Sequence, residues 1–341
     1  MIKPLQVPMF SPETEWVPPL NLPDLKEYSE IAIDLETRDP NLMTMGSGAI
    51  RGDGEIVGIA IAVEGWSGYF PIAHEAGGNM DRGLVLDWFE EVLHTDATKI
   101  FHNAMYDVSW IRALGFYIRG GIIDTMIAAS LVNENRFSFT LDSISKEYIG
   151  MGKNEKTLAE AAKSWGVNPK ADMWRLPAPL VGEYAERDAE VTLKLWQAMK
   201  HEITQQDLWD IFNLETSLFP CLVDMKFKGV RVDIDRAEVL KKDLNKQEKI
   251  IHEKIEKLSG FPIEIYAATS IAKAFDKLKI PYDRTDKGAP SFTKNFLATH
   301  PAELPKLIND AREMNKASST FIDTILKHEH NGRIHSDINQ I

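Results

Sequence analysis

Two apolar runs near the N-terminus most strongly constrain how this chain can fold. Residues 31–36 read Ile-Ala-Ile-Asp-Leu-Glu, and residues 55–63 read Glu-Ile-Val-Gly-Ile-Ala-Ile-Ala-Val. Short runs rich in β-branched residues and bounded by turn residues are typical of buried strands. A Gly-rich turn over residues 46–54 separates the two. The chain is therefore expected to build a buried sheet close to its start.

The segments that follow alternate between strand and helix patterns. We predict further strands over residues 67–72 and 99–102, and helices over 81–94, 103–114, parts of 124–165, and 182–201. Two strands followed by this alternation indicate an α/β domain with a mixed sheet.

Beyond about residue 206 the pattern changes to long helices with many charged residues. Helical periodicity is found over residues 211–228, 236–258 and 310–329. We therefore expect three parts: a Pro-rich N-terminal extension (1–28), an α/β domain (29–205) and a mostly α-helical domain (206–341).

The charge is unevenly distributed along the chain. Its formal net charge is -12, with a large excess of acids in residues 1–225 and a small excess of bases in residues 226–341. An acidic first part can hold divalent cations, and a mildly basic second part can lie along DNA. Two ordinary domains of unlike charge would give the same distribution, so charge alone does not decide.

The composition excludes several classes of protein. No apolar run reaches the roughly 20 residues that a membrane crossing needs, so we expect no membrane partner and a cytoplasmic setting. The single cysteine, Cys221, allows neither a disulfide framework nor a cysteine-rich metal site. Its place in an apolar helical pattern predicts a buried thiol.

Asp34 and Glu36 are two residues apart on the first predicted strand, so their side chains share one face of the sheet. Close carboxylates repel each other, and partly buried charges need a compensating partner such as a cation. The alternative is an acidic strand end that faces solvent.

Two further pairs of polar residues have helical spacing. Asn103 and Asp107 are four residues apart, as are Tyr184 and Asp188, so each pair shares one helix face. Taken singly, either pair could be a helix cap or ordinary packing. His102, at a predicted strand end, is interpreted as a hydrogen-bonded core residue rather than a metal ligand.

The order of these segments adds to their meaning. Asp-Leu-Glu at 34–36, Phe-His-Asn-Ala-Met-Tyr-Asp at 101–107 and Tyr-Ala-Glu-Arg-Asp at 184–188 resemble the three exonuclease motifs of family A DNA polymerases. Ile-Asp-Thr-Met at 123–126 is also similar to that family. These are the proofreading domains of the DEDD superfamily in its tyrosine form. The resemblance implies a ribonuclease H-like fold and 3′→5′ exonuclease activity on DNA.

The resemblance continues through the second part of the chain. Residues 214–233, 268–275, 286–293 and 332–340 resemble the thumb and the border of the palm. The chain ends at Ile341, where a complete family member would continue into palm and fingers. We therefore expect no polymerase activity from this chain alone, and a palm and fingers portion either in a longer polymerase or in a separate partner.

The resemblance also implies roles for individual residues. It implies two divalent ions, Mg²⁺ or Mn²⁺, held by Asp34, Glu36, Asp107 and Asp188. Tyr184 is expected to orient the attacking water, and Asn103 and Tyr106 to contact the DNA end. Lysines expected to follow the duplex backbone are Lys241, Lys242, Lys246 and Lys249, although a solvated helix face would carry the same residues.

Two other functions are compatible with these patterns. One is a stand-alone DEDD exonuclease that acts on RNA or on DNA repair intermediates. The other is a non-catalytic DNA-binding subunit of a replication complex. The thumb-like second part argues against the first, and the complete set of four carboxylates argues against the second.

Overall fold

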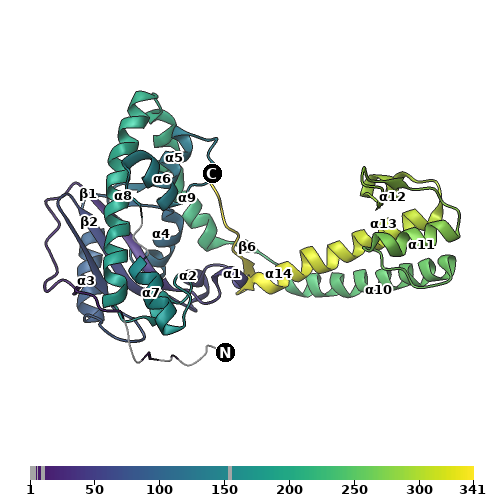
Figure 1. The fold of residues 1–341 in the computed structure, drawn as a ribbon, viewed down its shortest axis with the longest axis horizontal. Helices are drawn as coiled ribbons and strands as arrows, with labels where there is room; N and C mark the ends of the chain where they lie inside the picture. Colours follow the sequence, from purple (N-terminus) through teal and green to yellow (C-terminus); the bar gives the residue numbers. More distant parts are fainter. Residues whose placement is uncertain (1–4, 6, 9–11, 153–155) are drawn as a thin grey trace. The chain divides into compact units, whose positions relative to one another are not determined.

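The computed structural model describes residues 5, 7–8, 12–152 and 156–341 (Figure 1). The chain divides into two compact units, which we call the first and the second unit. The first consists of the chain up to Lys228 together with Ser336–Ile341, and the second consists of Gly229–His335.

The first unit is built on a five-stranded sheet with the order β3-β2-β1-β4-β5. The strands are β1 (Glu30–Arg38), β2 (Glu55–Val63), β3 (Trp66–Pro71), β4 (Thr98–Phe101) and β5 (Ile122–Asp124). β1, β2 and β3 are antiparallel, whereas β4 and β5 are parallel to β1. The expected mixed sheet is confirmed, and β1 is its central strand.

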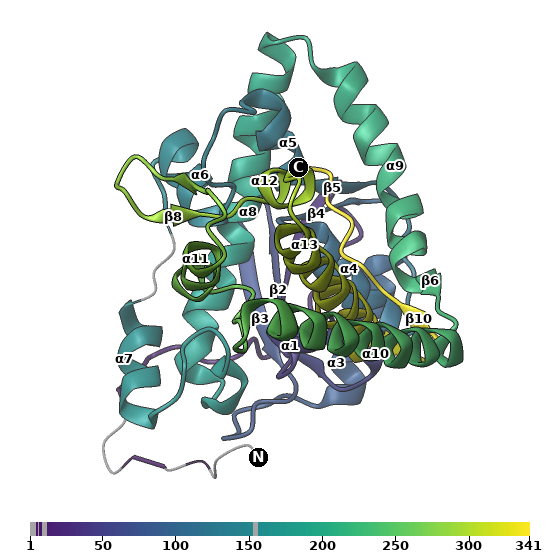
Figure 2. The same cartoon turned by 90° about the vertical axis from the view of Figure 1, so that its right-hand side faces the viewer.

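Helices cover both faces of this sheet (Figure 2). The core on one face packs Ala32 of β1 against α5 (Thr125–Val132), α6 (Leu141–Ile149), α7 (Lys156–Trp165) and α8 (Pro179–Gln205). The core on the other face packs the odd-numbered residues of β1 against α3 (Arg82–Leu93), α4 (Ala104–Ala113) and part of α9 (Trp209–Lys228). Both faces of β1 are thus covered, which accounts for its apolar sequence.

Most of the predicted elements are present, and the differences have local causes. The segment predicted as a Gly-rich turn contains two short helices, α1 (Leu42–Met45) and α2 (Gly48–Arg51). Arg51 holds this segment together, because its guanidinium contacts the carboxylates of Asp39 and Asp53. α8 begins at Pro179, three residues earlier than predicted, since proline is favoured at a first helical position. Helices were expected within residues 124–165, and within this span residues 153–155 lie outside the described residues.

The boundary between the two compact units lies later in the chain than the boundary predicted near residue 205. The first unit extends to Lys228, so α9 belongs to it and not to the second unit. Phe219 and Val223 place α9 in the same core as α4. Cys221 was predicted to be buried, and this prediction is wrong: Cys221 is exposed. An amphipathic helix can carry cysteine on either face, and α9 turns Phe219 inward instead.

The second unit is mostly helical, as expected. Its helices are α10 (Ile234–Ser259), α11 (Ala268–Lys277), α12 (Lys294–Thr299), α13 (Glu303–Asn315) and α14 (Asp323–His328), with a π-helical segment at Lys316–Ile322 between the last two. Its short strands are β6 (Val230–Arg231), β7 (Asp283–Arg284), β8 (Pro290–Ser291), β9 (Glu329–His330) and β10 (Arg333–Ile334). A small core around Ile255, Phe275 and Ile308 joins α10, α11 and α13. In the described parts of both units, no helix has the length and apolar character needed to cross a membrane.

Candidate active site

The carboxylates of β1 lie on the face of the sheet that α8 covers. Asp34 is in register with Ala60 of β2, which is in turn in register with Tyr69 of β3, so these three residues share one face. Asp34 and Glu36 are half-buried, whereas Leu35 between them is buried in the opposite core. The expectation that both acids share one face and are partly buried is confirmed.

A buried tyrosine lies beside these acids. The Tyr69 ring occupies the space above Gly58, where an added Cβ would lie 2.1 Å from its hydroxyl. Burial raises the pKa of Tyr69 well above its usual value, and the charges of Glu36 and Asp34 raise it further. Its hydroxyl is 2.7 Å from Nε2 of His74. Tyr69 was not predicted from the sequence. The one available signal was Gly58, which pairs with Glu36 and whose missing side chain leaves room for a neighbouring ring.

Asp107 reaches the same strand from α4. Its Oδ1 accepts a hydrogen bond from the backbone N–H of Leu35 at 3.0 Å, and its side chain is buried. Burial raises the pKa of Asp107 well above its usual range, and the nearby charge of Asp34 raises it further. Asp107 and Asp34 therefore lie close enough to repel each other.

Tyr184 and Asp188 reach the site from α8. Burial is the main cause that raises the pKa of Tyr184 far above its usual value, and the charges of Asp188, Glu36 and Asp34 follow in that order. A hydrogen bond with Asp188 acts in the same direction. The Tyr184 hydroxyl thus lies among three carboxylates and stays protonated.

The structure therefore brings together all four acids and the tyrosine predicted for the site. Asp34 is the common neighbour, because its charge acts on Asp107 from α4 and on Tyr184 from α8. The four acids offer only carboxylate oxygens, a set of donors that would suit Mg²⁺ or Mn²⁺. Within the described ranges, no three His, Cys, Asp or Glu side chains lie close enough together to hold an ion as they stand.

The start of α4 is fixed by a second acid. Asp124, at the end of β5, accepts hydrogen bonds from the backbone N–H groups of Asn103 (3.0 Å), Ala104 (2.7 Å) and Met126 (2.8 Å). Burial raises the pKa of Asp124 to about 6, although these hydrogen bonds act in the opposite direction. Asp124 thus caps α4 and α5 together. The sequence showed that Asp124 lies in the Ile-Asp-Thr-Met segment at 123–126, but it did not predict that Asp124 fixes the start of the helix that carries Asp107.

The residues predicted to contact DNA have different surroundings. Asn103 is exposed, with a φ of 66° at the N-cap of α4. The Tyr106 hydroxyl lies 2.6 Å from Oγ1 of Thr37, and burial raises the pKa of Tyr106 to about 12. His102 is hydrogen-bonded through both ring nitrogens, to Thr125 and to the Phe139 carbonyl. The interpretation of His102 as a hydrogen-bonded residue is confirmed.

The four predicted lysines lie on α10 of the second unit. Lys242, Lys246 and Lys249 are exposed. Lys241 is half-buried, and its Nζ lies 2.5 Å from the carboxylate of Asp323. Whether these lysines bind DNA stays a prediction.

Comparison with known sequences identifies several relatives. Residues 22–204 match the sequence model of the 3'-5' exonuclease domain of DNA polymerase A. The chain is 34% identical over 357 residues to a DNA-directed DNA polymerase of Pseudomonas phage M6, covering 99% of this chain and 52% of that protein. It is 31% identical to DNA polymerase DpoZ of Salmonella phage PMBT28 (93% of this chain, 51% of that protein) and 27% identical to DNA polymerase I of Pseudomonas aeruginosa (94% and 35%). The chain spans about half the length of the first two of these relatives.

A solved structure has a similar fold. The POL domain of Pol1 from M. smegmatis, determined in complex with DNA primer-template and dNTP, matches with a TM-score of 0.69 and 20% identity. The match covers 92% of this chain and 50% of that one. At this identity the likeness concerns the fold, and it confirms the expected ribonuclease H-like domain followed by a helical region.

Proposed function

Because the chain belongs to the 3'-5' exonuclease family of DNA polymerase A, we propose that it removes nucleotides from the 3′ end of DNA. The reaction is hydrolysis of the terminal phosphodiester, and its role is proofreading within a family A DNA polymerase during DNA replication. The observation that carries this proposal is the position of Asp34, whose charge acts on both Asp107 and Tyr184. Polymerisation is assigned to the part of the relatives that this chain does not span.

The four carboxylates are the proposed ligands of two divalent ions. Asp34 would contact both, Glu36 and Asp188 would complete one site, and Asp107 would help to hold the other. When bound, such ions activate water and neutralise the charge that develops on the phosphate and the departing 3′ oxygen. The raised pKa of Asp107 supports this assignment, because a cation would offset the repulsion between Asp107 and Asp34.

Tyr184 is proposed to orient the attacking water through its hydroxyl. Its raised pKa supports a role as a neutral hydrogen-bond donor rather than as a base. Tyr69 is also neutral and lies beside Asp34 and Glu36. Its buried ring would form part of the apolar core against which the site is built.

The proposed substrate is a single-stranded 3′ end or a frayed primer terminus. An unpaired end reaches a recessed site without the free-energy cost of melting a duplex. Asn103, exposed at the start of α4, is the proposed contact to the terminal nucleotide. Tyr106 would contribute through its ring, because its hydroxyl is engaged by Thr37. The lysines of α10 are proposed to follow the backbone of the duplex.

The decisive experiment is single-turnover cleavage of single-stranded DNA in the presence of Mg²⁺ or Mn²⁺. We expect Asp34→Ala to abolish cleavage nearly completely and Tyr184→Phe to slow it moderately, since only Asp34 would contact both ions. Equal losses in the two variants would contradict these roles. Lack of cleavage by the unaltered chain with both metals would favour the non-catalytic subunit.

A matched RNA oligonucleotide tests the remaining alternative. A proofreading enzyme is expected to prefer DNA, whereas equal or faster cleavage of RNA would favour the stand-alone exonuclease. The thumb-like second unit supports DNA as the substrate, because relatives that match this chain over nearly its whole length are named DNA polymerases.

A further inference from the structure

Phe137 is an aromatic residue that the site described above does not use. It lies between α5 and α6, and its relative exposure of 109% exceeds that of every other exposed large hydrophobic residue in the described ranges. Single exposed apolar side chains are common on protein surfaces, so exposure alone has no functional meaning. The contacts around Phe137 decide whether the loop that carries this ring is free or anchored.

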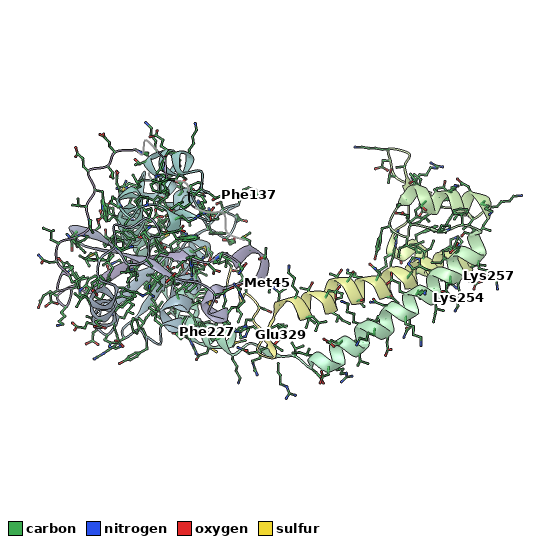
Figure 3. The ribbon with its side chains drawn as sticks, turned by 90° about the horizontal axis from the view of Figure 1, so that it is seen from below. Met45, Phe137, Phe227, Lys254, Lys257 and Glu329 are labelled. Atoms are coloured by element: carbon green, nitrogen blue, oxygen red, sulfur yellow. The ribbon has the colours of Figure 1, made fainter. Side chains whose placement is uncertain are left out.

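The loop on one side of Phe137 is held by a buried arginine. The Arg136 side chain is only 7% exposed, and its guanidinium lies 2.6 Å from the Glu147 carboxylate. It also donates hydrogen bonds to the Ser138 carbonyl at 3.3 Å and to the Ser143 hydroxyl at 3.4 Å. The backbone at Phe137 is therefore fixed from both neighbouring residues, and the ring points into solvent (Figure 3).

The loop is also attached to the helix that carries Asp107. Nε2 of His102 donates to the Phe139 carbonyl at 2.9 Å, and His102 directly precedes Asn103 at the start of α4. Two residues of extended chain span at most about 7 Å, so Phe137 lies close to this attachment point. The loop that carries Phe137 is thus anchored beside the start of α4.

We infer that Phe137 stacks on an unpaired base of a single-stranded DNA end, a short distance from the proposed exonuclease site. This inference rests on the proposed function. An exonuclease must accept every base, and stacking on an aromatic face is indifferent to base identity. The loop that carries Phe137 is anchored through Arg136 and through the Phe139 carbonyl, so little backbone freedom is lost on binding, which favours this use of an exposed aromatic.

The test measures binding of single-stranded oligothymidylate to the full chain by fluorescence anisotropy, with Asp34→Ala in every variant to prevent cleavage. Replacing Phe137 by Ala should raise Kd about 10-fold, whereas replacing it by Trp should preserve Kd. Tyr117→Ala is the matched control, because Tyr117 is 64% exposed in the same unit but packs on His94 with ring centroids 4.1 Å apart. Its Kd should not change.

Oligonucleotides with one abasic site, placed at each position from the 3′ end in turn, identify the stacked base. At one abasic position the protein with Phe137 and the Phe137→Ala variant should have the same Kd, whereas their Kd values should differ at all other positions. An unchanged Kd for Phe137→Ala, or a loss that is the same for every abasic position, would overturn the inference. In the case of an unchanged Kd, the exposed ring would be assigned to contact with a protein partner instead of DNA.

The two proposals can fail separately. Cleavage by the chain with Asp34 intact tests the exonuclease function, while the anisotropy series requires no cleavage. Active wild-type chain together with an unaffected Phe137→Ala variant would reject only the stacking role. Inactive chain that still shows the position-dependent loss would reject only the exonuclease function. Circular dichroism should give the same melting temperature for Phe137→Ala, because an exposed ring contributes little to packing.

Discussion

The carboxylate of Asp107 accepts a hydrogen bond from the backbone N–H of Leu35 at 3.0 Å, which attaches α4 to the strand that carries Asp34 and Glu36. The pairing of β1 with β4 ends at Ala32 and Ile100. Asp107 therefore satisfies a backbone donor that lies beyond the end of β4, while its charge faces Asp34. One side chain serves both the fold and the proposed site.

Substitutions at Asp107 should separate these two roles. In Asp107→Asn, the amide oxygen can still accept from Leu35, so we expect a stable protein that has lost most of its exonuclease activity. Asp107→Ala should lose activity and also lower the free energy of unfolding by about 1 to 3 kcal/mol, because a buried N–H is left unsatisfied. Urea unfolding and single-turnover cleavage measure both effects. Equal stabilities for the two variants would contradict the structural role of this hydrogen bond.

Asp124 should make stability depend on pH. Its pKa of about 6 in the folded state exceeds the value of about 3.9 expected in the unfolded chain. The folded state therefore binds this proton more tightly, and the resulting stabilisation is present below about pH 4 and lost as the pH rises through about 6. The loss amounts to at most about 3 kcal/mol. Unfolding of Asp124→Asn should show a correspondingly smaller decrease over this range, and an unchanged decrease would refute the assignment.

Tyr184 should not titrate during catalysis. Burial and the charges of Asp188, Glu36 and Asp34 raise its pKa above the usual value, so we expect the phenol to be neutral near pH 7. We expect Tyr184→Phe to lower the single-turnover rate by about 10- to 100-fold and to leave the shape of the pH–rate profile unchanged. If an alkaline limb of the wild-type profile disappears in the variant, Tyr184 ionises and the proposed role is wrong.

Lys99 should contribute to stability and not to catalysis. Its fully buried ammonium donates to the carbonyls of Thr95 (2.6 Å), Ala97 (2.9 Å) and Arg119 (2.9 Å). Lys99→Met leaves these carbonyls without their donor, which should lower the free energy of unfolding by about 2 to 4 kcal/mol. Lys163→Met, at an exposed position of α7, is the control and should change it by less than about 0.5 kcal/mol. Equal unfolding midpoints would show that the Lys99 contacts are not stabilising.

The lysines of α10 should be detected by the salt dependence of duplex binding. Replacing Lys242, Lys246 and Lys249 by Gln should reduce the slope of log K against log salt concentration by up to about 0.9 for each lysine that contacts a phosphate. Lys241→Gln should have a smaller effect, because its ammonium already pairs with Asp323. A slope that does not change in the triple variant would favour the solvated-face interpretation.

Local patterns were sufficient for several conclusions. Alternation along β1 predicted that Asp34 and Glu36 share a face, and the spacing of four residues paired Tyr184 with Asp188 on α8. Such periodicities depend only on backbone geometry, so they can be identified without knowledge of the fold. Where the pattern allowed both faces of a helix, as at Cys221, prediction from the sequence was wrong.

The types of elements, the residues that carry the carboxylates and, through three short motifs, the family resemblance could all be identified from the order of amino acids alone. The folded arrangement was needed to see that α4 and α8 bring their acids to β1, that Asp107 accepts from the Leu35 N–H, and that Tyr69 lies beside Asp34. Periodicity records which face of an element is apolar, but it does not record which elements pack together. That choice depends on contacts between residues far apart in the chain, such as those that join Leu35 to Asp107 and Asp34 to Tyr184.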